Sequence, residues 1–193
     1  MRKMEMIQKK KALRKHITYL KSVVPLLQMQ EESRHVVAAI EALAVFKQAR
    51  TVLAYWPMFK ELDLSSLLNK WQAEKVFLLP VVQGDSLEIR RFQGETSLAP
   101  GPSFGIMEPV GPAFNAFGDI DLVLVPGVAF DEEGRRIGHG KAYYDRLLPQ
   151  LTKAFKIGVG FSFQLVEDVP SEAHDVRLDL VVVPPMKPKD IGK

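Results

Sequence analysis

Residues 121–146 read DLVLVPGVAFDEEGRRIGHGKAYYDR, and their order predicts how the chain folds around a binding site. An apolar strand comes first, and a Pro-Gly break and an acidic turn follow it. The chain then runs through Gly138-His139-Gly140-Lys141 toward a helix. Glycines let backbone N–H groups approach an anion closely, and the start of a helix adds a favourable partial charge. The pattern therefore predicts a phosphate-binding loop after a buried strand, with a simple strand-to-helix connection as the alternative.

Short apolar runs alternate with helical patterns on both sides of this stretch. Strands are predicted at residues 51–56, 76–79 (stopped by Pro80), 87–92, 122–125, 157–161 and 180–183. Helices are predicted at residues 4–23 and 36–46, from a cap at Asp63 to residue 74, and at residues 141–152. Residues 94–118, rich in Gly, Pro and Phe, are expected to form a long ordered loop. The alternation favours an α/β fold with three layers, α/β/α, a mainly parallel central sheet, and an N-terminal helical segment packed on it.

Length and composition limit the class of protein. At 193 residues we expect one domain, residues 1–193, with helices in residues 1–48 and a flexible tail in residues 184–193. The chain has no cysteine, which excludes disulfides, thiolate metal sites and a cysteine nucleophile. No apolar run approaches the ~20 residues of a spanning helix, and the basic N-terminus has no apolar stretch behind it. We therefore expect a cytoplasmic monomer that acts on a small molecule; a net charge of +3 is too small to indicate nucleic acid, and no membrane partner is expected.

Cations and carboxylates gather around the glycine loop. Arg136 and Lys141 could neutralise phosphate oxygens, and lysine offers a mobile ammonium group. Asp145 and Asp175 are candidate Mg²⁺ ligands, because Mg²⁺ takes few protein oxygens beside those of phosphate and water. A helix-dipole or arginine partner for Asp145, and a turn cap at Asp175, are the alternatives.

Two further groups stand apart from the loop in the sequence. Glu61 follows the predicted strand that ends in Tyr55-Trp56, and a carboxylate beside aromatic rings suits a flat polar heterocycle. A surface glutamate that opens the next helix is the alternative. Lys10 and Arg14 are four residues apart and share one helix face, which is suited to an anion or is simply solvated. The four histidines have no metal-ligand spacing, and no serine lies in a nucleophile elbow.

Together these motifs resemble the 5-formyltetrahydrofolate cyclo-ligase family, also called 5,10-methenyltetrahydrofolate synthetase. The central match is Arg136-Ile137-Gly138-His139-Gly140-Lys141-Ala142-Tyr143-Tyr144-Asp145. Supporting matches are Lys10-x-x-Leu13-Arg14, Glu61, Phe104-Gly105-Ile106-x-Glu108-Pro109 and His174-Asp175-x-x-Leu178-Asp179. The resemblance extends over residues 10–183, nearly the whole chain.

The resemblance implies a ligase of folate and one-carbon metabolism with a three-layer α/β fold. It implies that ATP drives the cyclisation of 5-formyltetrahydrofolate to 5,10-methenyltetrahydrofolate through phosphorylation of the formyl oxygen, with release of ADP and phosphate. By this likeness Lys10, Lys11, Arg14 and residues 136–144 hold ATP, and Lys141 and Arg136 act in catalysis. The folate, which could carry a polyglutamate tail, meets Trp56, Glu61, Phe104, His139 and Tyr143. Asp145 and Asp175 hold Mg²⁺.

One residue departs from the family pattern, because Ala142 stands where the family has glycine. We expect Ala142 to lie in the start of a helix, where alanine is favourable; a positive φ would instead cost about 1 kcal/mol. Two other functions stay open on the sequence. One is a non-catalytic relative that binds folate or nucleotide, for which Ala142 is the only support. The other is an enzyme such as a sugar-phosphate isomerase with a similar architecture.

Overall fold

Six strands form one central sheet in the order β10-β9-β6-β1-β2-β3. They are β1 (Thr51–Leu53), β2 (Val76–Gln83), β3 (Ser86–Arg91), β6 (Leu122–Val125), β9 (Phe155–Val159) and β10 (Leu180–Val182). The first five strands in this order are parallel, and β3 is an antiparallel edge strand. The structure, a computed structural model, describes residues 2–101, 105–172 and 175–185. The predicted mainly parallel sheet is confirmed.

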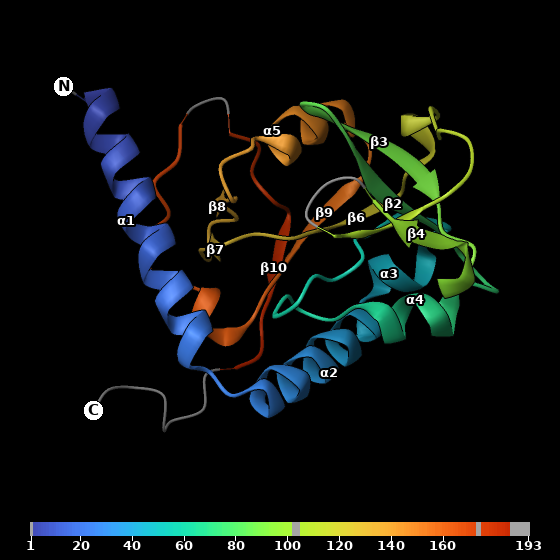
Figure 1. Cartoon of the computed structure of the whole chain (residues 1–193), viewed down its shortest axis with the longest axis horizontal. Coiled ribbons are helices and arrows are strands. Elements are labelled where there is room, and N and C mark those ends of the chain that lie inside the picture. The colour runs from blue at the N-terminus through green and yellow to red at the C-terminus, as the bar shows by residue number, and fades with distance from the viewer. Residues whose placement is uncertain (1, 102–104, 173–174, 186–193) are drawn as a thin grey trace.

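Helices cover both faces of the sheet, as Figure 1 shows. On one face α2 (Leu26–Ala42), α3 (Ala44–Gln48) and α4 (Ser65–Trp71) pack against side chains that include Leu122 and Leu124. On the other face α5 (Tyr143–Leu147) and the 3-10 helix η3 (Leu148–Gln150) pack against Val123 and Val125. Every residue of β6 is buried, because a central parallel strand has helices over both its faces. The three-layer prediction is therefore confirmed.

The N-terminal helix α1 (Arg2–Val23) stands at one end of the molecule beside the short strands β7 (Ala129–Phe130) and β8 (Arg136–Ile137) (Figure 1). Its buried residue Ile17 packs with Ile137 and Val169. The opposite face of α1 is charged, and no helix in the described part of the chain is long and apolar enough to cross a membrane. Lys10 and Arg14 lie on the packed side of α1, next to Ile17, so this packing sets both cations beside the segment that follows β6.

Several predicted boundaries were wrong for local reasons. The helix predicted over residues 36–46 is interrupted at Leu43, whose ψ of 133° is extended. The first strand ends at Leu53 instead of residue 56. The helix after Asp63 is shorter than predicted; it begins at Ser65, whose N–H donates to Asp63 Oδ1 at 2.8 Å. Likewise the helix predicted over residues 141–152 is only α5 followed by η3.

Pro80 does not stop its strand, because β2 continues to Gln83. Successive residues of a strand direct their backbone polar groups to alternate sides. Leu78 O accepts a hydrogen bond from Ala54 N at 2.9 Å, so Pro80, two residues later, faces the same side. Strand β1 has already ended there, so no neighbouring strand needs a hydrogen bond from the N–H that proline lacks.

The segment expected to be a long loop contains a small hairpin. Strands β4 (Leu98–Pro100) and β5 (Met107–Pro109) pair antiparallel, and the 3-10 helices η1 (Glu95–Ser97) and η2 (Phe117–Asp119) flank them. Val82 N donates to Glu108 Oε1 at 3.0 Å, which ties β5 to β2. The prediction of a long ordered loop missed these three-residue elements, since they are too short to give a sequence pattern. The β7–β8 pair and η4 (Ser162–Gln164) were not predicted either.

Candidate functional site

A cavity of about 310 Å³ opens where the parallel strands end. Its walls come from the segment after β1, from β2 and β3, from β5 and from the loop between β8 and α5; they include Tyr55, Trp56, Met58, Glu61, Pro80, Val82, Leu87, Ile106, Met107, Glu108, Arg136, Gly138, His139, Lys141, Ala142, Tyr143, Tyr144 and Asp145. Ligands of open α/β sheets bind beyond the carboxyl ends of the strands. The size and the mostly apolar wall with a few convergent charges suit a small organic molecule.

The acidic turn before the glycine loop is held by one fully buried carboxylate. Asp131 Oδ1 accepts the N–H groups of Glu133 at 3.1 Å and Arg135 at 2.9 Å. Its Oδ2 accepts the N–H of Val169 at 2.9 Å and lies 2.7 Å from Arg135 Nε in an ion pair. Asp131 thus shapes the β7–β8 turn and joins it to the segment that leads to β10. This arrangement delivers Arg136 to the cavity.

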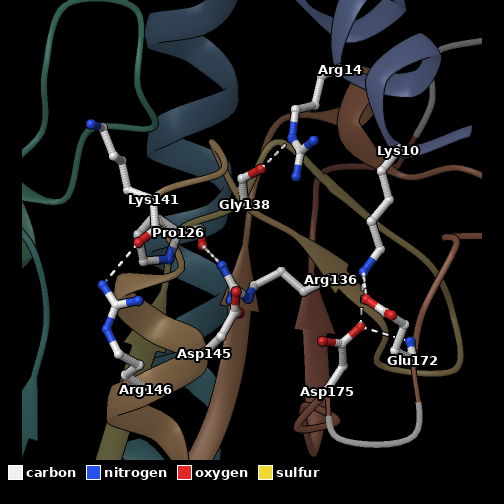
Figure 2. Close-up of polar contacts among 10 residues, drawn as sticks. All are labelled: Lys10, Arg14, Pro126, Arg136, Gly138, Lys141, Asp145, Arg146, Glu172 and Asp175. Carbon is white, nitrogen blue, oxygen red and sulfur yellow. Dashed lines mark hydrogen bonds and ion pairs between the residues drawn. The ribbon is translucent and has the colours of Figure 1, made fainter. Parts of the chain in front are cut away.

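Arg136 has a nearly buried side chain, 6% exposed, at the centre of the charged part of the site. Its guanidinium pairs with Asp145 Oδ1 and donates to Pro126 O at 3.5 Å (Figure 2). The same guanidinium lies 5.6 Å from the ring centroid of Tyr144. Burial lowers the pKa of Arg136, and the carboxylate of Asp145 opposes that shift. An arginine remains charged in this setting, so the site holds a fixed cation.

A second cation reaches the loop from the other end of the chain. Arg14 in α1 donates from Nε to Gly138 O at 2.8 Å (Figure 2). Lys141 lines the cavity, and Figure 2 shows its side chain extending away from Arg136. Arg146 in α5 donates to Lys141 O at 2.9 Å. Three arginines, Arg14, Arg136 and Arg146, therefore lie at or next to the glycine loop.

Ala142 has φ 55° and ψ 22°, in the left-handed region. The expectation that it lies in the start of a helix was wrong: it is the residue before α5, which begins at Tyr143. The chain turns there from the loop into the helix, and it does so with Ala142 in the left-handed conformation. A side chain in this conformation costs about 1 kcal/mol, which explains why glycine is favoured at such a position.

The two candidate metal ligands are each held by a cation. Asp145 pairs with Arg136, and Asp175 Oδ2 lies 3.3 Å from Lys10 Nζ and accepts the N–H of Glu172 at 2.8 Å. Lys10 Nζ also lies 3.0 Å from Glu172 Oε2 (Figure 2). The described residues contain no cluster of three or more ligand side chains that could cage a metal. The structure therefore contains both alternatives named from the sequence, an arginine partner for Asp145 and a turn contact for Asp175.

Glu61 lies on the other side of the cavity, 13% exposed and held by backbone. Its Oε2 accepts the N–H of Met58 at 3.0 Å, and its Oε1 lies 3.8 Å from His139 Nε2. Burial lowers the pKa of His139, and Glu61 opposes that shift. Lys21 and Lys60 line a smaller hollow beside Glu61. This side of the cavity thus has both a carboxylate and cations.

The structure brings most of the predicted site residues together. Trp56, Glu61, Arg136, Gly138, His139, Lys141, Ala142, Tyr143, Tyr144 and Asp145 line the cavity. Arg14 touches its loop, while Lys10 and Asp175 meet each other beside Glu172. Ile137 instead packs in the apolar cluster under α1, and Lys11 is exposed and does not line the cavity. Phe104 lies outside the described residues.

Several wall residues were not predicted. Met58, Val82, Leu87 and Met107 line the cavity with apolar surface, and their own sequence neighbourhoods give no signal of a site. Glu108 is the exception, since it stands in the Phe104–Pro109 motif that supported the family resemblance. In the structure it is a buried acid of the cavity wall.

Fold and site together define an α/β protein with a cationic glycine loop after a parallel strand and an adjoining apolar pocket. The family model of the 5-formyltetrahydrofolate cyclo-ligase family matches residues 6–184. The chain belongs to this family.

Similar proteins agree with this membership. The NMR structure of Aquifex aeolicus 5,10-methenyltetrahydrofolate synthetase is 39% identical, has a TM-score of 0.79, and matches over 89% of this chain and 88% of that one. The Mycolicibacterium smegmatis 5-formyltetrahydrofolate cyclo-ligase is 33% identical over 70% of this chain and 74% of its own length. The Escherichia coli K12 protein of the same name is 30% identical over 81% of this chain and 90% of its own length.

Proposed function

We propose that this chain is a 5-formyltetrahydrofolate cyclo-ligase, which uses ATP to convert 5-formyltetrahydrofolate into 5,10-methenyltetrahydrofolate and releases ADP and phosphate. Membership of the family over residues 6–184 supports the proposal. The contact of Arg14 Nε with Gly138 O, 2.8 Å long, carries it. That contact sets a cation of α1 on a glycine loop that adjoins an apolar pocket, and the reaction needs both parts.

The reaction has two bond exchanges. The formyl oxygen attacks the γ-phosphorus of ATP, and the bond from that phosphorus to the oxygen of ADP breaks. N10 of the folate then attacks the formyl carbon, the carbon–oxygen bond to phosphate breaks, and N10 loses its proton. No protein nucleophile is required, so catalysis depends on positioning and on neutralising charge. This agrees with a site that has arginines and a lysine and with a chain that has no cysteine.

Within this proposal the arginines and the lysine share the nucleotide's charge. Arg136, fixed by Asp145 and Pro126, faces the loop as a preorganised cation. Lys141 lines the cavity from the loop itself and is the mobile cation that follows the transferred phosphoryl group. Arg14, and Lys10 beside Asp175, complete the nucleotide side from α1. We assign ATP to this side of the site, with Lys11, Ile137 and Gly140 as backbone or peripheral members.

The residues fit a Mg²⁺ ion that arrives with the nucleotide. Asp145 is 45% exposed, and Asp175 lies near the same buried arginine; burial lowers the pKa of Arg136, and both carboxylates oppose that shift. Two carboxylates without a preformed cage suit Mg²⁺, which completes its shell with phosphate oxygens and water. When bound, the ion would neutralise charge on the phosphates. Release of Asp145 and Asp175 from Arg136 and Lys10 would then accompany nucleotide binding.

The apolar pocket is assigned to the folate. Trp56 and Tyr143 offer aromatic surface, Glu61 offers an acceptor for N–H donors, and His139 lines the pocket from the glycine loop. Lys21 and Lys60, on the side of Glu61, would face the anionic tail of the substrate, including added glutamates. Folate and nucleotide thus meet along residues 138–143.

Ala142 is the one observation in favour of a binding-only relative. Its left-handed backbone costs about 1 kcal/mol, which is a factor of about five in an equilibrium constant. Such a factor weakens the loop without abolishing turnover. The family match also removes the support for a sugar-phosphate isomerase.

Absorbance in the near ultraviolet tests the proposal directly. Purified protein is mixed with 5-formyltetrahydrofolate, Mg²⁺ and ATP, and the methenyl chromophore is followed beside a control without ATP. Growth of the chromophore only with ATP is the expected result. Folate and ATP binding at equilibrium without chromophore or phosphate release would select the binding-only relative instead.

A further inference from the structure

Glu108 lines the pocket, but it has no role in the proposed reaction. It lies in β5, it is 6% exposed, and it lines the large cavity. Its Oε1 accepts the N–H of Val82 at 3.0 Å. Within the described part of the chain no donor reaches its second oxygen, Oε2. Glu108 lines the cavity, and its Oε2 is not among the fully buried side-chain atoms that lack a partner, so this oxygen is open to a hydrogen-bond donor that enters the cavity.

The neighbouring chain makes room for this carboxylate. Gly101 follows β4, and a Cβ atom built on it would lie 2.3 Å from Glu108 Oε2. The Gly101 N–H donates to Ile106 O at 2.8 Å, which holds the glycine against β5. Any side chain at residue 101 would therefore displace the acid. Oε2 has a fixed place at the wall of the cavity, set by a backbone bond on one side and a glycine on the other.

The neighbours of Glu108 along β5 and across its contact with Val82 are apolar. Val82, Leu87, Ile106 and Met107 line the same cavity from β2, β3 and the β4–β5 hairpin. Glu61 differs, because it has His139 Nε2 at 3.8 Å and Lys21 and Lys60 at the adjoining hollow. The pocket thus has one acid among cations and another among aliphatic side chains. A flat ring that carries N–H donors on its edge matches the second acid.

We propose that Glu108 binds the 2-amino group and N3–H of the substrate's pterin ring. This inference rests on the proposed function, because it assigns the ring's orientation within the folate pocket. The two N–H groups are parallel neighbours on one edge of the pyrimidinone, and a carboxylate accepts such a pair with both oxygens. Oε1 accepts the Val82 N–H with one lone pair and has a second one free, and both lone pairs of Oε2 are available. The aliphatic side chains then contact the faces of the ring.

The test compares two substrates in one protein. One is 5-formyltetrahydrofolate, and the other is its 2-desamino-2-methyl analogue, which lacks the amino donors. A site that is built to bind a donor rejects the analogue without it by orders of magnitude. For the unchanged protein we expect kcat/KM to be on the order of 100-fold lower for the analogue. In Glu108→Gln we expect the ratio of the two kcat/KM values to fall below about five. The NH2 group of glutamine is a donor, so it cannot accept a hydrogen bond from the amino group of the substrate.

This ratio separates recognition from a structural role. Glutamine keeps an oxygen for the Val82 N–H, and a damaged pocket would slow both substrates equally and leave the ratio unchanged. The KM for ATP should not change in Glu108→Gln. Glu88→Gln is the matched control, because Glu88 pairs with Arg90 on β3 and does not line the cavity.

Two results would overturn the inference. Undiminished discrimination in Glu108→Gln would show that Glu108 does not bind the ring edge. Loss of discrimination in Glu61→Gln, with Glu108→Gln unchanged, would assign that edge to Glu61. The comparison first requires that the unchanged protein turns over 5-formyltetrahydrofolate. Absence of that turnover would refute the proposed function instead.

Discussion

Asp131→Asn should destabilise the fold, because one buried carboxylate supports the whole approach to the glycine loop. Oδ1 accepts two backbone N–H groups, and an amide oxygen could still accept both. Oδ2 accepts the N–H of Val169 and pairs with Arg135. An amide nitrogen in place of Oδ2 would set a donor against both groups in a site with no exposure. A charge-assisted hydrogen bond contributes about 1.5–3 kcal/mol, and a buried ion pair that loses one partner costs about 3–5 kcal/mol.

Because those two effects overlap, we expect a loss of about 3–5 kcal/mol in the free energy of unfolding. For a protein of this size that loss lowers Tm by about 10 °C. Thermal and urea unfolding, followed by circular dichroism, measure it. Glu132→Gln is the matched control, since Glu132 is an exposed neighbour in the same turn and its Tm should change by less than about 2 °C. An equally small change in Asp131→Asn would refute the role given to this carboxylate.

Three other changes test the site. Lys141→Ala should abolish ATP-dependent methenyl formation and leave Tm unchanged, and unaltered turnover would remove Lys141 from the mechanism. Ala142→Gly should raise the free energy of unfolding by about 0.5–1 kcal/mol through relief of the left-handed strain, and a decrease would contradict the backbone conformation. Burial lowers the pKa of His139, so the unfolded chain binds more protons below about pH 6.5, and stability should fall as the pH is lowered from that value. The side chain is 60% exposed, so the effect is small; His139→Asn should flatten the profile, and an unchanged profile would exclude this histidine.

The spacing of apolar residues and the order of predicted helices and strands predicted the layers of the fold. The run at β6 was found with its observed bounds, because a strand between two helical layers must be apolar at every residue. The boundary at Pro80 was wrong for a tertiary reason. A proline ends a strand only if a neighbouring strand needs its N–H, and this depends on where β1 ends.

The chemical types at the site were evident in the sequence, since glycines, cations and carboxylates have a local spacing. The groups that these residues contact were not evident in the sequence. Asp131, Glu108 and Arg14 obtain their roles from Val169, Val82 and Gly138, and the partners of Asp131 and Arg14 lie far away in the chain. The same holds for Lys10 and Asp175, which come together from opposite ends of the sequence.

By itself, the sequence determined the α/β class, the glycine loop after a buried strand and the acids and cations that could serve it, because periodicity and residue chemistry are local properties. Only the tertiary structure decided that Ala142 is left-handed, that Arg136 holds Asp145, and that an acid of the β4–β5 hairpin faces the pocket. These depend on which segments pack together. Packing is set by the sum of burial over the whole chain, and no short stretch of sequence encodes it.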